Sequence, residues 1–199
     1  MSFFSHQKKV ESTVWTIKNV YKEYSSFKKP KFQRKMKWTV LPAKNKKIAS
    51  FREYIDFLMK YENSQIPIAL GKNTEQNFYT VCDGNNRIHA IIYFLKHPYK
   101  LYSEWYIDII EYIENTDVFN KIRDDLLTMI KELPYTILCN YTLDDLVDDP
   151  STDEEIRNVI DNLSRREFTE LKTKYKELQK KFWFNRSEKF DATESIKIV

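Results

Sequence analysis

Residues 83–87 (DGNNR) combine a carboxylate, one of only two glycines in the chain, two amides and a guanidinium. The apolar residues 78–82 before them predict a strand, and the apolar residues 88–95 after them predict a helix. A helix that begins directly after such a turn presents free backbone N–H groups and the positive end of its dipole at one point. Arg87 adds a planar cation that suits phosphate oxygens, and Asp83 adds a group that can hold a metal or accept a proton. The segment therefore predicts an anion site with phosphate chemistry.

A simpler interpretation of the same residues stays open. Asp83 can cap a helix and Gly84 can form an ordinary turn without any ligand. His89 lies two residues beyond Arg87. There it can face the same site as an acid, a base or a metal ligand, or it can be a half-buried helix residue.

The elements that would position this site are a small sheet and two helices. Their patterns are alternation for strands, a three-to-four spacing of apolar residues for helices, and a Ser-x-x-Glu capping box. In chain order we expect a strand over 14–17, a helix over 50–61 opened by a Ser50–Glu53 capping box, a Pro-containing strand over 66–70, a polar turn over 71–77, a strand over 78–82 and a helix from Gly84 to about Lys96.

The second half of the chain reads as mostly helical. Its expected elements are a strand or helix over 105–112, an amphipathic helix over 117–133, a strand over 135–139, an acidic loop over 144–150, and helices opened by capping boxes at Ser151–Glu154 and Ser164–Glu167. The carboxylates of the acidic loop are Asp144, Asp145, Asp148 and Asp149. Their spacing does not match a calcium-binding loop, so a solvated acidic loop is the favoured interpretation over a metal site.

Length and composition indicate one folded α+β protein of 199 residues, with 42 % hydrophobic and 15 % aromatic residues. We expect residues 1–100 to form a core that carries the predicted anion site and a basic N-terminal segment, and residues 101–199 a mostly helical extension packed on it in one continuous domain. No apolar run is long enough to cross a membrane, and residues 1–10 show no apolar signal segment. Cys82 and Cys139 are expected to be buried and reduced, which fits a cytoplasmic location, or the host cytoplasm or nucleus for a viral protein.

Charge is unevenly distributed along the chain. Residues 1–60 carry a formal balance of +11, whereas residues 111–170 carry −10. The basic segment Lys28–Lys47, interleaved with Phe32 and Trp38, can follow a DNA backbone, or it can be a solvated arm. Trp38 itself is expected to be a core or lid aromatic residue.

The order of motifs in the first half resembles a known superfamily. Phe32-Gln33-Arg34, Trp38, the helix over 50–61, Ile66-Pro67-Ile68 and the DGNNR turn follow one another in the chain. This order resembles the ParB/sulfiredoxin superfamily, in the branch formed by the N-terminal domain of GmrSD-type modification-dependent restriction enzymes. That branch has an early Gln-Arg, a Trp soon after, a helix, a Pro-containing strand and a strand–DGQQR–helix element. The resemblance covers about residues 30–98.

This resemblance implies a small mixed sheet packed with helices and a nucleotide-phosphate site at the start of the helix after Gly84. Members of the superfamily bind or hydrolyse nucleoside triphosphates there, and in the restriction branch this activity accompanies DNA cleavage. By resemblance, Asp83 is the catalytic or Mg²⁺-binding carboxylate and Arg87 the catalytic phosphate ligand. Gln33 and Arg34 are expected to approach from the other side.

Asn85 and Asn86 depart from the family pattern, which has two glutamines at these positions. Asparagine keeps the amide donors and acceptors but is one methylene shorter, so the nucleotide contacts of this chain are expected to differ. Binding of a nucleotide is therefore a firmer expectation than its hydrolysis.

Several functions stay open beside a nucleoside triphosphatase active in a restriction-like, defence-like or viral process. They are a non-catalytic DNA-binding protein, an interaction protein with a vestigial pocket, and a metal-dependent DNA-nicking enzyme that uses Asp83. The chain has no Walker-type glycine loop, no zinc-like Cys/His spacing and only three histidines. Cleavage of DNA would then come from a separate nuclease partner, and the chain can also form a homo-oligomer.

Overall fold

The computed structural model describes residues 13–30, 37–43, 48–60, 68–73, 76–184 and 195–198. These residues divide into two compact units. The first contains the described residues up to Ile91 together with the strand at 195–198, and the second begins at Ile92 and includes the long helix that ends at Phe184. The division falls inside one helix, α3 (Asn85–Lys96).

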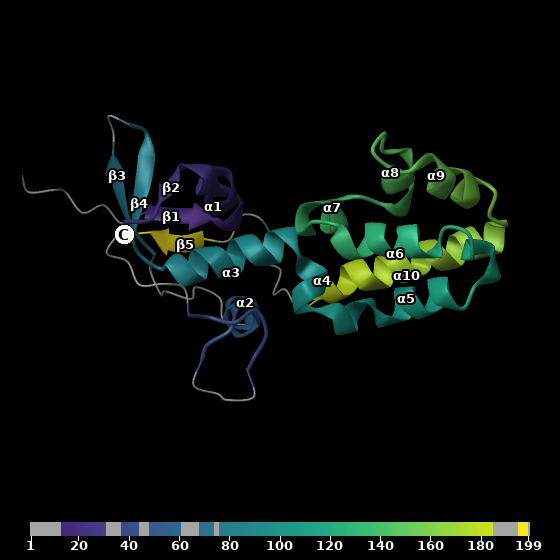
Figure 1. Ribbon diagram of the computed structural model, residues 1–199, viewed down its shortest axis with the longest axis horizontal. Coiled ribbons are helices and arrows are strands. Elements are labelled where there is room, and N and C mark those ends of the chain that lie inside the picture. The colour runs from purple at the N-terminus through teal and green to yellow at the C-terminus, as the bar shows by residue number, and fades with distance from the viewer. Residues whose placement is uncertain are drawn as a thin grey trace, which may run out of the picture. The chain divides into compact units, whose positions relative to one another are not determined.

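The first unit contains a three-stranded mixed sheet (Figure 1). Its strands are β2 (Phe27–Lys28), β3 (Ala69–Asn73) and β4 (Phe78–Asp83), in the order β2-β4-β3. β2 runs parallel to β4 and β3 runs antiparallel to it. The strand predicted over 78–82 is confirmed, but the turn predicted over 71–77 is shorter. β3 continues to Asn73, and Asn77 takes a positive φ of 47° in the turn before β4.

The first unit also contains a two-stranded sheet and the helices α1 and α2. β1 (Thr13–Thr16) pairs antiparallel with β5 (Ser195–Ile198), close to the strand predicted over 14–17. α1 (Ile17–Glu23) follows β1 and ends in a short 3-10 turn, η1 (Tyr24–Ser26).

α2 (Phe51–Lys60) begins as its sequence predicts. The hydroxyl of Ser50 accepts from the backbone N–H of Glu53 at 3.2 Å, and the Glu53 carboxylate accepts from the Ser50 N–H at 2.9 Å. This capping box satisfies two groups that a helix start leaves free. The helix then buries Phe51, Tyr54, Ile55 and Met59 on one face.

The described residues of the second unit form helices joined by short turns. It starts with the last turns of α3 (Asn85–Lys96) and continues with α4 (Pro98–Leu101), η2 (Ser103–Tyr106), α5 (Ile107–Glu114), η3 (Asp117–Phe119), α6 (Arg123–Glu132), α7 (Tyr135–Asn140), α8 (Leu143–Asp148), α9 (Glu154–Asp161) and α10 (Arg165–Phe184).

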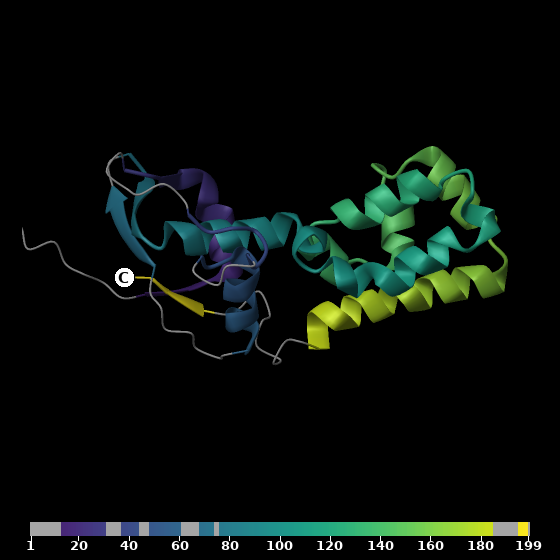
Figure 2. The same ribbon diagram turned by 60° about the horizontal axis from the view of Figure 1, so that its bottom comes forward.

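α10 is the longest of the described helices in this unit, and α5 lies along it (Figures 1 and 2). Ser164 and Glu167 form the capping box predicted at its start. Its face of Leu171, Tyr175, Leu178 and Phe182 is buried. Around Phe182 gather the rings of Phe94, Tyr102, Trp105, Tyr106 and Tyr135, with centroids 4.7–6.4 Å from it.

Residues 135–139, predicted as a strand, are a helix. Residues 135–139 form α7, whose turn buries Tyr135, Leu138 and Cys139 at the three-to-four spacing of a helix. Residues 105–112, for which the sequence left a strand or a helix open, lie in η2 and α5 and are helical. In both segments burial against helices overrides the local preference of aromatic and β-branched residues.

Three further boundaries in this half differ from the sequence analysis. The helix predicted over 117–133 is interrupted, because η3 and α6 are separated by a turn over 120–122. The acidic loop predicted over 144–150 is mostly helical, since α8 covers 143–148. Asp153, not Ser151, caps α9 by accepting from the Glu155 N–H at 2.8 Å.

The protein is thus α+β, with a small three-stranded mixed sheet early in the chain and a mostly helical C-terminal half. Cys139 is buried, but the expectation that Cys82 is buried was wrong, because this residue near the end of β4 is exposed. Both cysteines are free thiols. Among the described helices, none combines the length and apolar composition that crossing a membrane requires.

Candidate functional site

The turn between β4 and α3 has a conformation that only glycine supports. Gly84 has a φ of +92°, a region that L side chains rarely adopt. A Cβ at this position would lie 2.9 Å from Cγ1 of Ile68 and 3.2 Å from Nε of Arg87. The backbone at Gly84 therefore lies too close to Ile68 and Arg87 to leave room for a side chain, which explains why one of the two glycines of the chain occupies this position.

The first helical hydrogen bond of α3 runs from the Ile88 N–H to the carbonyl of Gly84 at 2.9 Å. The N–H groups of Asn85, Asn86 and Arg87 precede this bond, so they have no partner within the helix. Gly84 is buried, while Asn85, Asn86 and Arg87 are half-buried. The strand–turn–helix predicted from the sequence is therefore present, with its free N–H groups at the end of β4.

Arg87 bends back over this turn. Its guanidinium donates to the Asp83 carboxylate at 2.7 Å, and its side chain is 14 % exposed against 77 % for Asp83. The Nε of Arg87 is buried and has no hydrogen-bond partner among the described residues. Burial raises the pKa of Tyr54 in α2 to about 12, and the charge of Arg87 acts against this rise.

Asp83 serves in this structure as the partner of Arg87. Within the described part of the chain, no group of three His, Cys, Asp or Glu side chains is arranged to hold a metal ion. A metal at Asp83 would therefore draw its remaining ligands from a bound molecule or from water. Mg²⁺ accepts such a donor set, since it often takes one or two carboxylates plus phosphate oxygens.

His89 faces Tyr24 of η1. Its Nδ1 lies 3.5 Å from the Tyr24 hydroxyl, and the two rings meet edge to face with centroids 6.2 Å apart. The cluster continues from Tyr24 to Phe27 at 6.3 Å and from Phe27 to Tyr79 at 6.0 Å. Burial, and secondarily the charge of Lys29, hold the pKa of His89 below its usual value of 6.5. His89 is therefore a neutral, half-buried helix residue near neutral pH.

The other predicted contacts of the site are described only in part. Gln33 and Arg34 lie outside the described residues, and so does much of the basic segment Lys28–Lys47. At its start, the ammonium of Lys28 lies 3.9 Å from the ring centroid of Phe78, a cation–π contact. Trp38 is half-buried and packs on Tyr54 with ring centroids 5.5 Å apart.

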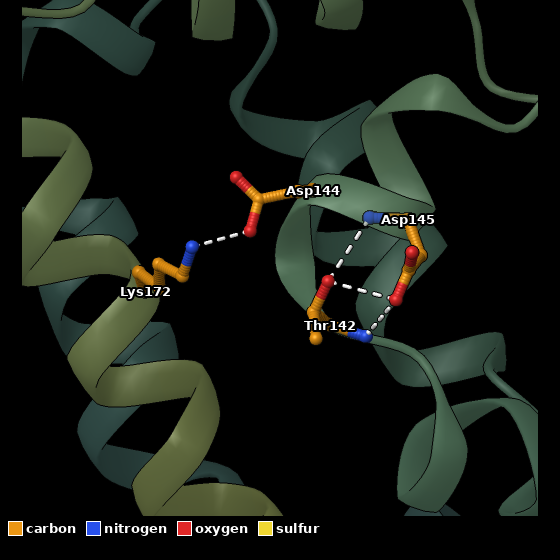
Figure 3. Close-up of polar contacts among 4 residues, drawn as sticks. All are labelled: Thr142, Asp144, Asp145 and Lys172. Atoms are coloured by element: carbon orange, nitrogen blue, oxygen red, sulfur yellow. Dashed lines mark hydrogen bonds and ion pairs between the residues drawn. The ribbon is translucent and has the colours of Figure 1, made fainter.

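Two acidic residues of α8, Asp144 and Asp145, have structural partners (Figure 3). Asp144 forms an ion pair with Lys172 of α10. Asp145 accepts from the backbone N–H of Thr142 at 2.7 Å and from its hydroxyl at 2.8 Å, which completes a capping box. Hydrogen bonds from Thr142 lower the pKa of Asp145, and those from Ser151 lower the pKa of Asp149. These carboxylates cap and tie helices.

Three contributors to the site were missed by the sequence analysis. Tyr54 could have been found, because it lies three residues after Phe51 on the buried face of α2. Ile68 and Tyr24 meet Gly84 and His89 through contacts that are distant in the sequence. No local pattern signals such contacts.

Comparison with known proteins adds no relative. No protein-family model, no curated protein and no solved structure matches the chain.

Proposed function

We propose that this chain binds a nucleoside triphosphate at the start of α3, as a ParB/sulfiredoxin-like protein. The observation that carries the proposal is the convergence at the Gly84 turn. Three backbone N–H groups without helical partners and a guanidinium whose Nε is buried and unpartnered lie there together. Phosphate oxygens are the ligands that such a combination of helix N-terminus and arginine suits best.

Each residue has a distinct role in this proposal. The N–H groups of Asn85, Asn86 and Arg87 would bind phosphate oxygens, and the guanidinium of Arg87 would neutralise their charge. Gln33 and Arg34 would contribute from the opposite side, as the resemblance of the first half to the superfamily implies. The shorter asparagine amides would contact the nucleotide differently from the family's glutamines.

Hydrolysis is the further part of the proposal. Asp83 would orient water or bind Mg²⁺, and Arg87 would stabilise the charge that develops on the transferred phosphoryl group. Mg²⁺, when bound, supplies charge neutralisation at the phosphates. His89 is neutral and tied to Tyr24, so it would contact the nucleotide as a hydrogen-bonding group and not as a cation.

The test is isothermal titration calorimetry of the four ribonucleoside triphosphates, with and without Mg²⁺. Arg87→Ala should weaken binding at least tenfold, because a charge-assisted hydrogen bond contributes roughly 1.5–3 kcal/mol. Arg52→Ala is a matched control, since Arg52 pairs with Asp56 at the same i,i+4 spacing in α2. The proposal is wrong if no nucleotide gives a binding signal, or if both variants bind as the wild type does.

Asp83→Asn separates the two roles of the carboxylate. A loss of Mg²⁺-dependent affinity would assign Asp83 to the metal. An unchanged or higher affinity without Mg²⁺ would assign it to holding Arg87, because removing the counter-ion frees the guanidinium for phosphate.

DNA binding is a second candidate, supported by the balance of +11 in residues 1–60. Its affinity would come from phosphate contacts and would fall steeply with salt. Gel-shift titrations between 50 and 200 mM salt test this, and an affinity that persists across that range would contradict it. Incubation of supercoiled plasmid with Mg²⁺ or Mn²⁺, comparing wild type with Asp83→Ala, decides whether the chain also nicks DNA.

A further inference from the structure

A cavity of about 450 Å³ opens in the second unit, away from the residues of the proposed nucleotide site. It lies among α6, α7, α8 and α9, and includes the turn that joins α8 to α9. Its apolar wall consists of Met129, Leu133, Pro134, Ile137, Leu146 and Ile156. Cavities of this size with mostly apolar walls are typical of sites that hold a few large apolar groups.

The charged residues that line this cavity are all acidic. They are Asp125, Asp149 and Asp153. Asp125 stands exposed in the first turn of α6, and Asp153 caps α9. Hydrogen bonds from Ser151 lower the pKa of Asp149, so this carboxylate stays ionised well below neutral pH. No lysine, arginine or histidine is among the lining residues.

The acidic side of the cavity is built in advance. The Asp149 carboxylate accepts from the Ser151 N–H at 2.8 Å, and the Thr152 hydroxyl donates to the carbonyl of Leu146. Arg157 donates to the carbonyls of Asp149 and Thr152 at 3.2 and 2.8 Å. These bonds fix the conformation of the α8–α9 turn. The single positive charge of Arg157 offsets only part of the negative charge of the three carboxylates. A preformed site loses little free energy to ordering when it binds.

We infer that this cavity, together with its three carboxylates, binds a basic amphipathic segment of a partner protein. An aliphatic or aromatic side chain of the segment enters the apolar cavity, and neighbouring Lys or Arg side chains meet the three carboxylates. Charge complementarity selects this occupant, because the rim repels phosphates and acidic peptides. Residues 111–170, which contain the cavity, also carry a balance of −10 that attracts a cationic partner. The inference does not depend on nucleotide binding.

The experiment uses the full chain and a defined probe, a 14-residue amidated peptide with Leu at every third or fourth position and Lys elsewhere. Binding is followed by amide chemical shifts and by calorimetry. The variant D125N/D149N/D153N removes the three charges, while the asparagine oxygens at 149 and 153 can still accept the hydrogen bonds that Ser151 and Glu155 donate. The variant Thr128→Trp leaves the charges in place and obstructs the mouth of the cavity, because Thr128 lines it from an exposed position on α6.

Two controls accompany these variants. E111Q/E114Q/D161N removes the same formal charge from exposed positions that do not line the cavity. A second peptide replaces every Lys with Glu. We expect shifts at the lining residues, at least tenfold weaker binding for the triple asparagine variant and for Thr128→Trp, and less than threefold change for the control variant. Absence of shifts at the lining residues, equal binding of the Glu peptide, or an equal loss in the control variant would overturn the inference.

Discussion

Gly84→Ala is the sharpest test of the geometry at the β4–α3 turn. The chain has only two glycines, and the structure places them in opposite situations. Gly84 has a φ of +92° and no room for a Cβ. Gly71, in β3, has an ordinary backbone conformation, and its Cβ would lie 3.5 Å from the nearest atom, the sulfur of Cys82.

The expected cost at Gly84 has two parts. Holding an alanine in a sparsely populated backbone region costs roughly 1–3 kcal/mol. The new Cβ would also sit 2.9 and 3.1 Å from the two γ carbons of Ile68, which is fully buried. Moving a packed side chain to relieve such contacts costs about 1–3 kcal/mol. Gly84→Ala should therefore reduce the free energy of unfolding of the first unit by about 2–6 kcal/mol.

Gly71→Ala is the matched control. Its new methyl group makes ordinary van der Waals contacts, and alanine restricts the unfolded chain more than glycine does. We expect a change between zero and about 1 kcal/mol in the stabilising direction. The same chemical substitution thus has opposite expected signs at the two positions.

Urea titration followed by amide NMR intensities in β4 and α3 measures both variants, because it reports on the first unit residue by residue. The free energy of unfolding falls by about 1–3 kcal/mol per molar urea. Gly84→Ala should therefore lower the urea concentration at the unfolding midpoint by on the order of 1–3 M, or leave the unit unfolded in water. Equal midpoints for the two variants would refute the argument from backbone conformation and space.

Two further predictions concern titratable side chains. Native protein treated with a thiol reagent should label Cys82, which is exposed, and spare Cys139, whose pKa burial raises to about 12; labelling of both at equal rates would contradict this. Burial holds the pKa of His89 below 6.5, so below about pH 6.5 the unfolded chain binds a proton that the folded chain does not. The first unit should therefore lose stability as pH falls through this range, and His89→Gln should reduce that loss in urea midpoints measured at pH 7.5 and 5.5.

The parts of the fold that follow local rules could be predicted from the sequence. The β4–Gly84–α3 element and the capping boxes at Ser50 and Ser164 depend on residues within four positions of one another. At these helix starts, side chains of nearby residues form the hydrogen bonds that the first backbone N–H groups of the helix lack. The strand–turn–helix of the candidate site belongs to this class.

The predictions that were wrong concern short segments whose conformation is decided by distant partners. Residues 135–139 carry β-branched and aromatic residues, yet they form α7 because Tyr135 packs on Phe94 and Phe182. The acidic sequence of α8 is typical of a loop. The segment is nevertheless helical, because Thr142 caps its start and Lys172 of α10 forms an ion pair with Asp144 (Figure 3). Phe94, Phe182 and Lys172 lie outside a window of five or six residues, so propensity alone gives the wrong result there. The Thr142–Asp145 capping box is local, and its Thr-x-x-Asp spacing could have been recognised in the sequence.

The pairing of Asp83 with Arg87 constrains how a phosphate can bind. The i,i+4 spacing across the turn brings the two side chains together at 2.7 Å without any ligand. A phosphate that takes Arg87 would displace Asp83, which is 77 % exposed, and leave its carboxylate beside another anion. Two adjacent anions repel each other, and a divalent cation bound by both is the group that relieves the repulsion. Nucleotide binding and Mg²⁺ binding should therefore be coupled at this site, with Asp83 passing from the arginine to the metal.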